Sequence, residues 1–382
     1  MVHISEREIQ LPDSVVTKLL CLVAESKDVI SLSLGEPDFI TPKPLLDYSK
    51  KVISNSTHYS PTAGYSELRE AIVKKLRKEN KINCGTENVM AGCGSQELFF
   101  AGFNTVLDVT EEVVLPSPCY LAYIPQIELV GGVPKLFELK EEDNWDVNPD
   151  ELKKAIDRKK TKVILVNTPS NPTGNVLSRK LLEEIADIAV EYGLYIFSDE
   201  AYEKLTYDKK HFSPGSLNGM KDHVVTFQTF SKSFAMCGYR LGYVCGPEKL
   251  IDAMTKVSHY ITLAPPSLAQ KVAIKALSLP RIHTEKMRKE YDRRRKYIVN
   301  RLNEIGLITK TPNGAFYAFS NIKPFGKNSF DFADELLKKQ KVAVVPGTEF
   351  GRYGEGYIRF SYATDIKLIE KGLDRIEKFL KR

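Results

Sequence analysis

The 382-residue sequence has few cysteines, and their spacing fits neither a metal site nor a disulfide framework. The six cysteines form no C-x-x-C pair and no cluster with histidine. No apolar run approaches the ~20 residues that span a bilayer. Charges occur throughout the first twenty residues, so no signal peptide is expected. These absences favour a cytoplasmic protein without a metal site and without a membrane partner.

The chain also lacks a strong excess of charge of one sign. Its 55 Lys and Arg against 49 Asp and Glu give a net charge of +6. The densest basic cluster, residues 288–296, is interrupted by acidic residues, which is typical of the solvated face of a helix. Nucleic-acid binding is therefore not expected. With 42% apolar residues the composition is globular, and the length favours two domains.

Strand-like and helix-like segments alternate from about residue 46 onward. Strands are predicted at residues 88–91, 112–116, 133–137, 162–167, 194–198, 223–227 and 241–245, and helices at 66–79, 95–106, 148–157 and 178–192. This alternation predicts an α/β fold with a mainly parallel seven-stranded sheet between helices. Ligands of such sheets bind beyond the carboxyl ends of the strands. We therefore expect the polar loops that follow these strands to meet at one edge.

The two ends of the chain predict a second, smaller α+β domain. A helix at 12–26 and a strand at 29–34 come first, and a helical region covers 247–305. Short strands near 315–319, 341–345 and 357–361 and helices near 328–339 and 365–381 follow it. We expect residues 1–45 and 280–382 to form the small domain, and residues 46–279 the large one.

One lysine differs from the others in its surroundings. Lys232 lies between the apolar segments 224–227 and 241–245, next to the small residues Ser231 and Ser233. A lysine in dry surroundings loses its proton more easily and becomes an amine nucleophile. Most lysines are solvated surface charges, so this stretch alone leaves both interpretations open.

A glycine-rich turn at residues 92–96 leads from a predicted strand into a predicted helix. Backbone amides at a helix N-terminus suit an anion, and Gly94, Ser95 and Gln96 lie at that point. Glu97 takes the place of the third glycine in G-x-G-x-x-G, which argues against a dinucleotide fingerprint. In isolation such a turn is more often structural.

Three further strand ends and one strand carry side chains that suit a ligand. Tyr120, Asn171 and Asp199 each follow a predicted strand, and Arg359 lies within one. Packing, a turn, a helix cap and a structural ion pair are the respective alternatives. Each motif therefore leaves its role open when it is taken alone.

Together these residues match the needs of one cofactor chemistry. An aldehyde cofactor needs an amine, a phosphate cradle, an acid for its ring nitrogen, partners for its phenolic oxygen, a stacking aromatic and an arginine for the substrate carboxylate. Lys232 is the candidate amine, and the candidates for the phosphate cradle are Gly94, Ser95, Gln96, Ser231 and Arg240. Asp199 is the candidate acid for the ring nitrogen, and Asn171 and Tyr202 are the candidate partners of the phenolic oxygen. Tyr120 is the candidate stacking aromatic, and Arg359 is the candidate for the substrate carboxylate.

The order of these motifs resembles that of class I/II aminotransferases of pyridoxal-phosphate fold type I, in particular the prokaryotic and archaeal aspartate and aromatic enzymes. The resemblance extends from about residue 10 to the end of the chain. It is carried by Gly35-x-Pro-Asp-Phe, Tyr59-x-Pro-x-x-Gly64, Asn171-Pro-Thr-Gly, Asp199-Glu-x-Tyr202, Ser231-Lys232-x₅-Gly238-x-Arg240, Pro312-x-Gly314-Ala-Phe-Tyr317 and Arg359-x-Ser-Tyr.

The resemblance implies pyridoxal 5'-phosphate as the cofactor and a homodimer with shared active sites. It implies a covalent bond to the cofactor at Lys232, which also transfers the substrate's α-proton, and roles in catalysis for Asp199 and Tyr202. The implied phosphate ligands are Gly94, Ser95, Gln96, Thr229, Ser231, Arg240 and, from the neighbouring subunit, Tyr59. The implied ring contacts are Tyr120, Asn171, Asp199 and Tyr202, and the implied substrate contacts are Gly35, Asn171 and Arg359.

The implied reaction moves an amino group from an L-amino acid to 2-oxoglutarate by a ping-pong mechanism. The donor stays open between aspartate, aromatic and broader sets, because Ser95 stands where some aspartate enzymes of the subgroup carry lysine. A C–S β-lyase of the same fold is an alternative that uses the same residues. A non-catalytic pyridoxal-phosphate-sensing regulator is a more distant one, since only about ten residues precede the matched part and Lys232 is intact.

Overall fold

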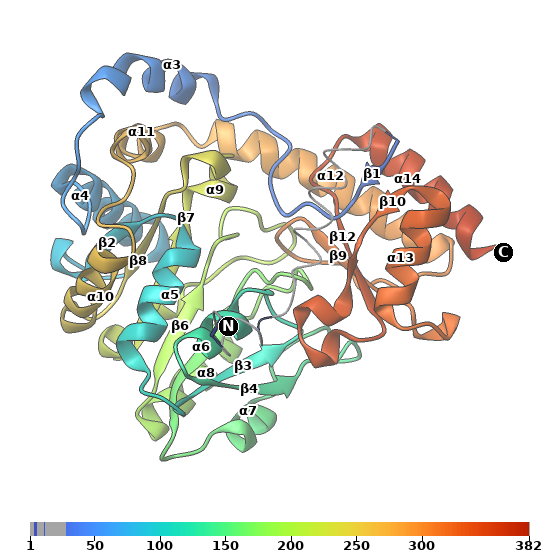
Figure 1. Cartoon of the computed structure of the whole chain (residues 1–382), viewed down its shortest axis with the longest axis horizontal. Coiled ribbons are helices and arrows are strands. Elements are labelled where there is room, and N and C mark those ends of the chain that lie inside the picture. The colour runs from blue at the N-terminus through green and yellow to red at the C-terminus, as the bar shows by residue number, and fades with distance from the viewer. Residues whose placement is uncertain (1–3, 6–10, 12–27, 382) are drawn as a thin grey trace.

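A seven-stranded sheet forms the centre of the computed structural model, which describes residues 4–5, 11 and 28–381 (Figure 1). The strand order is β2 (Val89–Gly92), β8 (Gly242–Cys245), β7 (Val224–Thr229), β6 (Tyr195–Asp199), β5 (Thr161–Asn167), β3 (Glu112–Ser117) and β4 (Val133–Glu138). Within this sheet β8 runs antiparallel to both neighbours, and the other pairs are parallel. The predicted α/β fold with a mainly parallel sheet is confirmed.

Side chains alternate between the two faces of the sheet, and a layer of helices covers each face. Val113 and Leu115 belong to one hydrophobic core, and Val114 between them belongs to the other. The first face packs against α5 (Ser95–Val106), α6 (Tyr123–Leu129) and α10 (Glu248–Ile261). The opposite face packs against α4 (Ser66–Lys75), α7 (Pro149–Ala155), α8 (Arg179–Tyr192) and α11 (Ser267–Leu277).

The C-terminal elements gather on one side of the sheet and include a strand from the start of the chain. β1 (Ile30–Ser31) pairs in parallel with β10 (Val342–Ala343), and the blue β1 lies among orange and red elements in Figure 1. A three-stranded antiparallel sheet has the order β11 (Val345–Pro346), β12 (Tyr357–Ser361), β9 (Tyr317–Asn321). The helices are α12 (Ile282–Glu304), α13 (Ser329–Gln340) and α14 (Ile366–Leu380). Among the described residues, no helix has the length and apolar character needed to cross a membrane.

Proline lies at two of the differences from the predicted elements. Helix α3 (Lys43–Val52) was not predicted because Pro42 and Pro44 suggest a loop, yet proline is tolerated in the first turn of a helix. The predicted helical region 247–305 consists of α10, α11 and α12, which are separated near Pro266 and Pro280.

Two predicted strands are shorter than expected, and one predicted helix is outside the described residues. The strand predicted at 341–345 divides into β10 and β11, which join different sheets, and the one predicted at 29–34 is reduced to β1. The predicted helix at 12–26 lies outside the described residues. Helix α4 continues as a π-helical turn, Leu76–Asn80, which ends at Lys81 with a φ of 62°.

Candidate active site

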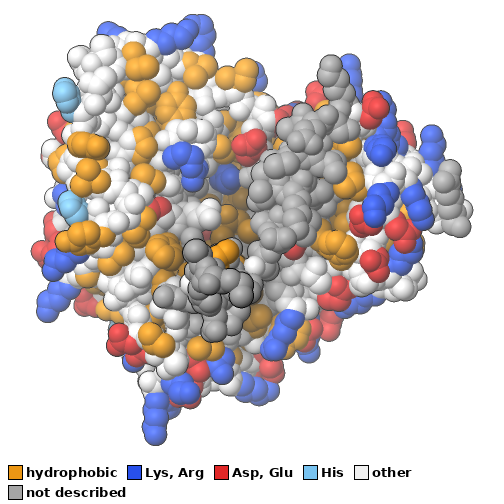
Figure 2. All heavy atoms as spheres, in the orientation of Figure 1, with side chains coloured by type: hydrophobic (Ala, Val, Ile, Leu, Met, Phe, Trp, Pro, Cys, Tyr) orange, Lys and Arg blue, Asp and Glu red, His pale blue; other side chains and the backbone are white. Residues whose placement is uncertain are grey.

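A cavity of about 770 Å³ opens at the carboxyl edge of the large sheet. Loops after β3, β5, β6 and β7 meet there, and the start of β8 lies at the same edge because this strand runs in the opposite direction. Of the residues predicted from the sequence, the cavity is lined by Gly35, Ser95, Gln96, Tyr120, Asn171, Asp199, Tyr202, Thr229, Ser231, Lys232, Arg240 and Arg359. In the space-filling view, basic side chains are visible in a hollow near the centre of the face shown (Figure 2).

Lys232 lies on a short helix, α9 (Phe230–Ser233), that begins directly after β7. Thr229 caps this helix by accepting a hydrogen bond from the Ser231 backbone N–H at 3.1 Å. The Lys232 ammonium donates to the Gly35 carbonyl oxygen at 2.6 Å and lies 5.9 Å from the centroid of the Tyr202 ring. The lysine is therefore half-buried within the cavity rather than solvated on the surface.

Groups suited to an anion line one corner of the cavity. Ser95 and Gln96 form the first turn of α5, whose N–H groups have no partner within the helix. Gly94, which precedes this turn, does not itself line the cavity; a Cβ atom there would lie 2.6 Å from an Arg240 guanidinium nitrogen. The Thr229 and Ser231 hydroxyls, 3.0 Å apart, complete a set of donors that fits a phosphate.

Only glycine permits the sheet to approach this corner so closely. A Cβ atom at Gly242, the first residue of β8, would lie 2.7 Å from the backbone nitrogen of Ser95. The strand that carries Arg240 at its start can therefore lie directly against the N-terminus of α5. Arg240 itself has a φ of 51°, and its guanidinium donates to the Cys237 carbonyl at 3.0 Å.

Asp199 ends β6 and is buried in the wall of the cavity, with 6% exposure. Its Oδ1 accepts the Ala201 backbone N–H at 3.0 Å, and its Oδ2 accepts the Tyr123 hydroxyl at 2.5 Å. Burial raises the pKa of Asp199 to about 6, although both hydrogen bonds and the nearby Lys232 charge oppose this shift. A cationic partner in the cavity would stabilise the ionised form of this buried carboxyl group.

Arg359 is the most deeply buried cation of the site. It is 2% exposed, donates to Asn171 Oδ1 at 3.0 Å and to the Ser33 carbonyl at 2.6 Å, and leaves its Nε without a partner. No carboxylate in the described part of the chain forms an ion pair with it, and burial lowers its pKa. The alternative of a structural ion pair is therefore not seen, and the guanidinium fits a carboxylate that enters the cavity.

Aromatic rings frame the rest of the cavity. The hydroxyls of Tyr202 and Tyr317 lie 2.8 Å apart, and the Arg359 guanidinium stacks 4.4 Å from the Tyr317 ring centroid. Burial raises the pKa of Tyr120 to about 12, so its phenol stays neutral. At Gly35 a Cβ atom would lie 2.9 Å from the Tyr317 hydroxyl, which explains why this turn carries glycine.

One predicted residue lies apart from the cavity of this chain. Tyr59 is 85% exposed, and Tyr260 close to it is 89% exposed. The two segments are joined by a contact of 3.3 Å between the Thr62 hydroxyl and His259 Nδ1. Their apolar rings project into solvent from the single subunit.

Three residues that form hydrogen bonds with predicted site residues were missed by the sequence analysis. Tyr123 binds Asp199, Tyr317 binds Tyr202, and Asn167 donates to the Asp199 carbonyl at 3.2 Å. Tyr317 stood within a quoted motif and Asn167 ends a predicted strand, so both had a positional signal. Tyr123 also lies in the segment after a predicted strand, but only Tyr120 was assigned a role there, and packing was the favoured interpretation of the segment in isolation.

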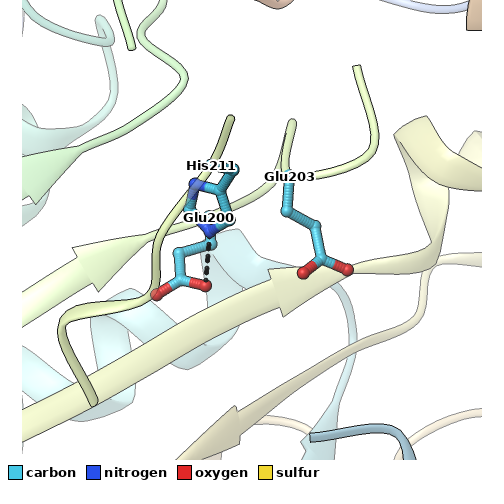
Figure 3. Close-up of side chains that lie close together, drawn as sticks. All are labelled: Glu200, Glu203 and His211. Carbon is cyan, nitrogen blue, oxygen red and sulfur yellow. Dashed lines mark hydrogen bonds and ion pairs between the residues drawn. The ribbon is translucent and has the colours of Figure 1, made fainter. Parts of the chain in front are cut away.

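Glu200, the residue after Asp199, belongs to a dense polar network, and Figure 3 shows its carboxylate close to Glu203 and His211. Glu200 is fully buried, and its carboxylate accepts hydrogen bonds from five side chains: Asn80, Ser198, His211, Ser213 and Gln228. Glu203 faces the same space, and ligand atoms of Glu200, Glu203 and His211 lie within 4.8 Å of one another. The spacing alone would accommodate a metal ion.

Lysine already neutralises this acidic cluster. The buried Lys75 ammonium donates to Glu203, to Gln228 Oε1 at 2.5 Å and to Asn80 Oδ1 at 2.8 Å, which uses all three of its protons. Burial alone would raise the pKa of Glu203, but attraction to Lys75 and Lys204 holds it well below its usual range. We interpret the cluster as an anchor for the turn that carries Asp199 and Tyr202, not as a metal site.

The fold and this site agree with comparisons to known proteins. The family model for aminotransferase class I and II matches residues 27–376. The chain is 46% identical to an aspartate aminotransferase of Pyrococcus abyssi, over 96% of both chains. It is 43% identical to an aromatic-amino-acid aminotransferase of Thermococcus litoralis, over 99% of this chain and 98% of that protein. The crystal structure of an aromatic aminotransferase from Pyrococcus horikoshii superposes with a TM-score of 0.91 at 45% identity, covering 96% of this chain and 99% of that one.

The chain belongs to the class I and II aminotransferases, a family that depends on pyridoxal phosphate. It is an amino-acid aminotransferase of the fold expected from its sequence motifs.

Proposed function

We propose that the protein binds pyridoxal 5'-phosphate in the described cavity and transfers an amino group from an L-amino acid to 2-oxoglutarate by a ping-pong mechanism. The observation that carries the proposal is the cavity's combination of a half-buried amine, a buried carboxylate and a buried guanidinium without a carboxylate partner. These groups are Lys232, Asp199 and Arg359. The cofactor supplies an electron sink, and the residues supply binding and proton transfer.

Each residue of the cavity has a role that follows from its chemistry. Lys232 holds the cofactor covalently and moves the substrate's α-proton. The donors at the phosphate corner are Gly94, Ser95, Gln96, Thr229, Ser231 and Arg240. Asp199 pairs with the ring nitrogen, Asn171 and Tyr202 bind the ring oxygen, and Tyr120 stacks on the ring. Arg359, with Gly35 and Asn171 beside it, binds the substrate's α-carboxylate.

The amino donor is proposed to be aspartate, an aromatic amino acid or a broader set. Relatives of both kinds are similar to this chain, at 46% identity for an aspartate enzyme and 43% for an aromatic one. The cavity-lining residues include the apolar side chains Phe100, Leu121 and Leu129, which suit an aromatic donor.

We further propose a homodimer in which Tyr59 reaches the phosphate bound to the neighbouring subunit. The strong exposure of Tyr59 and Tyr260 supports this, because apolar surface of this kind is typical of an interface. Mixing two inactive proteins would test it. Lys232→Ala subunits combined with Tyr59→Ala subunits should recover activity, since each mixed dimer contains one site with both residues intact. Failure to recover any activity would contradict shared sites.

We propose the domain division expected from the sequence, with residues 46–279 as the large domain and residues 1–45 and 280–382 as the small one. The pairing of β1 with β10 supports it, as does the common core of Ile30 and Leu32 with Phe360 and Ile369. We also propose a cytoplasmic location, on the composition of the chain.

The central experiment is a half-reaction screen. Purified protein with pyridoxal phosphate should show a visible absorption band, and an active amino donor should convert that band without any oxo acid present. Aspartate, glutamate, tyrosine, phenylalanine, alanine and leucine are compared. Absence of the visible band would refute cofactor binding. Steady release of ammonia from the amino acid alone would indicate a lyase.

A further inference from the structure

Tyr123 forms a hydrogen bond with Asp199, and none of the roles proposed above involves it. Tyr123 begins α6, is fully buried and directs its hydroxyl at Asp199 Oδ2, 2.5 Å away. Its ring packs 5.3 Å from Phe99 and edge-on at 5.3 Å from Tyr120, so packing contacts fix its orientation. The Ala201 backbone N–H holds the other oxygen of the carboxylate.

The direction of this hydrogen bond is defined by the two groups. Burial and the Asp199 charge raise the pKa of Tyr123 well above its ordinary range, so the phenol keeps its proton and acts as the donor. A hydroxyl that donates to a carboxylate stabilises the ionised form. The other charged groups acting on Asp199 are Lys232, which favours ionisation, and Glu200, which opposes it.

The ionised form of Asp199 relies on fewer hydrogen-bond donors than that of the neighbouring Glu200. In the described chain the Asp199 side chain accepts two hydrogen bonds, one on each oxygen, whereas that of Glu200 accepts from five different side chains. Loss of the Tyr123 hydroxyl would leave Oδ2 without its donor in a nearly dry wall. The carboxylate would then be less ionised and free to rotate.

We propose that Tyr123 is a positioning residue for the aminotransferase reaction, which holds the Asp199 carboxylate ionised and oriented for its pairing with the cofactor's ring nitrogen. This inference rests on the proposed function of Asp199. It assigns Tyr123 no contact with the substrate and no proton transfer. Its effect on cofactor and substrate is exerted through Asp199 alone.

Tyr123→Phe removes one oxygen atom and leaves the ring packing unchanged. In the protein without cofactor, the Asp199 pKa, followed by carboxyl NMR, should rise above the value of the unmodified protein. The dissociation constant for pyridoxal phosphate should increase about 10- to 100-fold, since a hydrogen bond to a charged group is lost. The pH profile of the half-reaction should shift in the same direction as the Asp199 pKa.

A matched control is Tyr357→Phe. Tyr357 is also buried and also donates to a carboxylate, Glu141 Oε2 at 3.2 Å, but lies outside the cavity. This variant should leave the Asp199 pKa and cofactor affinity unchanged. Equal effects of the two substitutions would show a general loss of stability and overturn the proposal.

A double-mutant cycle separates positioning from other roles. If Tyr123 acts through Asp199, the Tyr123→Phe substitution should have no further effect on cofactor affinity in the Asp199→Asn background. An undiminished effect there would overturn the proposal, as would a Tyr123→Phe protein that matches the unmodified one in both Asp199 pKa and affinity. If the unmodified protein binds no pyridoxal phosphate, the proposed function fails instead, and the NMR measurement alone reports on Tyr123.

Discussion

Asp199 and Glu200 are consecutive buried carboxylates with opposite surroundings. Glu200 faces a polar network and accepts hydrogen bonds from five side chains, while Asp199 lines the cavity and has two donors. Burial of both would be costly without partners. Glu200 is the more completely hydrogen-bonded of the two within the described chain, so we interpret it as a structural charge. Asp199 has fewer donors and remains available to a ligand in the cavity.

Two buried arginines show the same contrast. Arg295 is 1% exposed and binds Asp208 and Asp292, both at 2.6 Å, and the Pro312 carbonyl at 2.7 Å. Arg359 is buried to the same degree and has no such carboxylate in the described chain. Incomplete pairing of a buried charge thus marks the functional site, and complete pairing marks the framework.

The strongest test of the functional side is Lys232→Ala. This variant should still bind pyridoxal phosphate without a covalent bond, yet lose transamination by orders of magnitude, because the proton-transfer group is removed. Single-turnover absorption kinetics would measure the loss. Normal turnover in this variant would contradict the assignment of Lys232.

The two arginines can be compared directly by replacing each with leucine. Arg359→Leu should lower kcat/KM at least about 100-fold, or about 2.7 kcal/mol, by removing the partner of the substrate carboxylate, without lowering the free energy of unfolding. Arg295→Leu should lower the free energy of unfolding by about 1–3 kcal/mol, with kcat/KM nearly unchanged. The reason is that this substitution removes the partner of Asp208 and one of the two partners of Asp292, which keeps Lys296, and takes the donor from the Pro312 carbonyl. Denaturant titration and steady-state kinetics measure both, and a reversed pattern would refute the contrast.

The pH dependence of stability tests Asp199. In the protein without cofactor its pKa is about 6, against an ordinary value of 3.8 that applies after unfolding. Between these values the folded protein holds a proton that the unfolded chain releases, so stability falls as pH rises from about 4 to about 6, by up to about 3 kcal/mol. Asp199→Asn should abolish this decline. If unfolding curves of the variant keep the full decline, another group is responsible.

Glu200→Gln tests the structural side and should have the smallest effect of the four. The amide replaces an oxygen that accepts several donors, so the free energy of unfolding should fall by about 1–3 kcal/mol. Glu112→Gln is a control on the opposite end of the sheet, where a 3% exposed carboxylate has two side-chain partners in the described chain, the Thr161 hydroxyl at 3.3 Å and the Lys135 ammonium at 3.4 Å. Thermal unfolding should show a smaller change for the control, and equal changes would argue against the special role of the network.

The strands and the motifs at their ends could be predicted from the sequence because both depend on local patterns. Short, mainly apolar runs define most of the seven strands, and the topology of parallel sheets brings their carboxyl ends to one edge. Asn171, Asp199 and Lys232 follow such strands directly and were predicted for that reason. The helix α3 was missed because proline near a helix start looks the same in sequence as proline in a loop.

By itself, the sequence determined the fold class and most of the candidate residues, because hydrophobic periodicity and strand-end chemistry are local, while Gly35, Tyr59 and Thr229 became candidates through the resemblance of the motifs to a known family. Only the tertiary structure decided which buried charges are completely paired. Arg359 and Asn171 meet although they are 188 positions apart, and Tyr123 and Asp199 meet across 76. Such contacts depend on how helices and sheets pack in space, which no local pattern specifies.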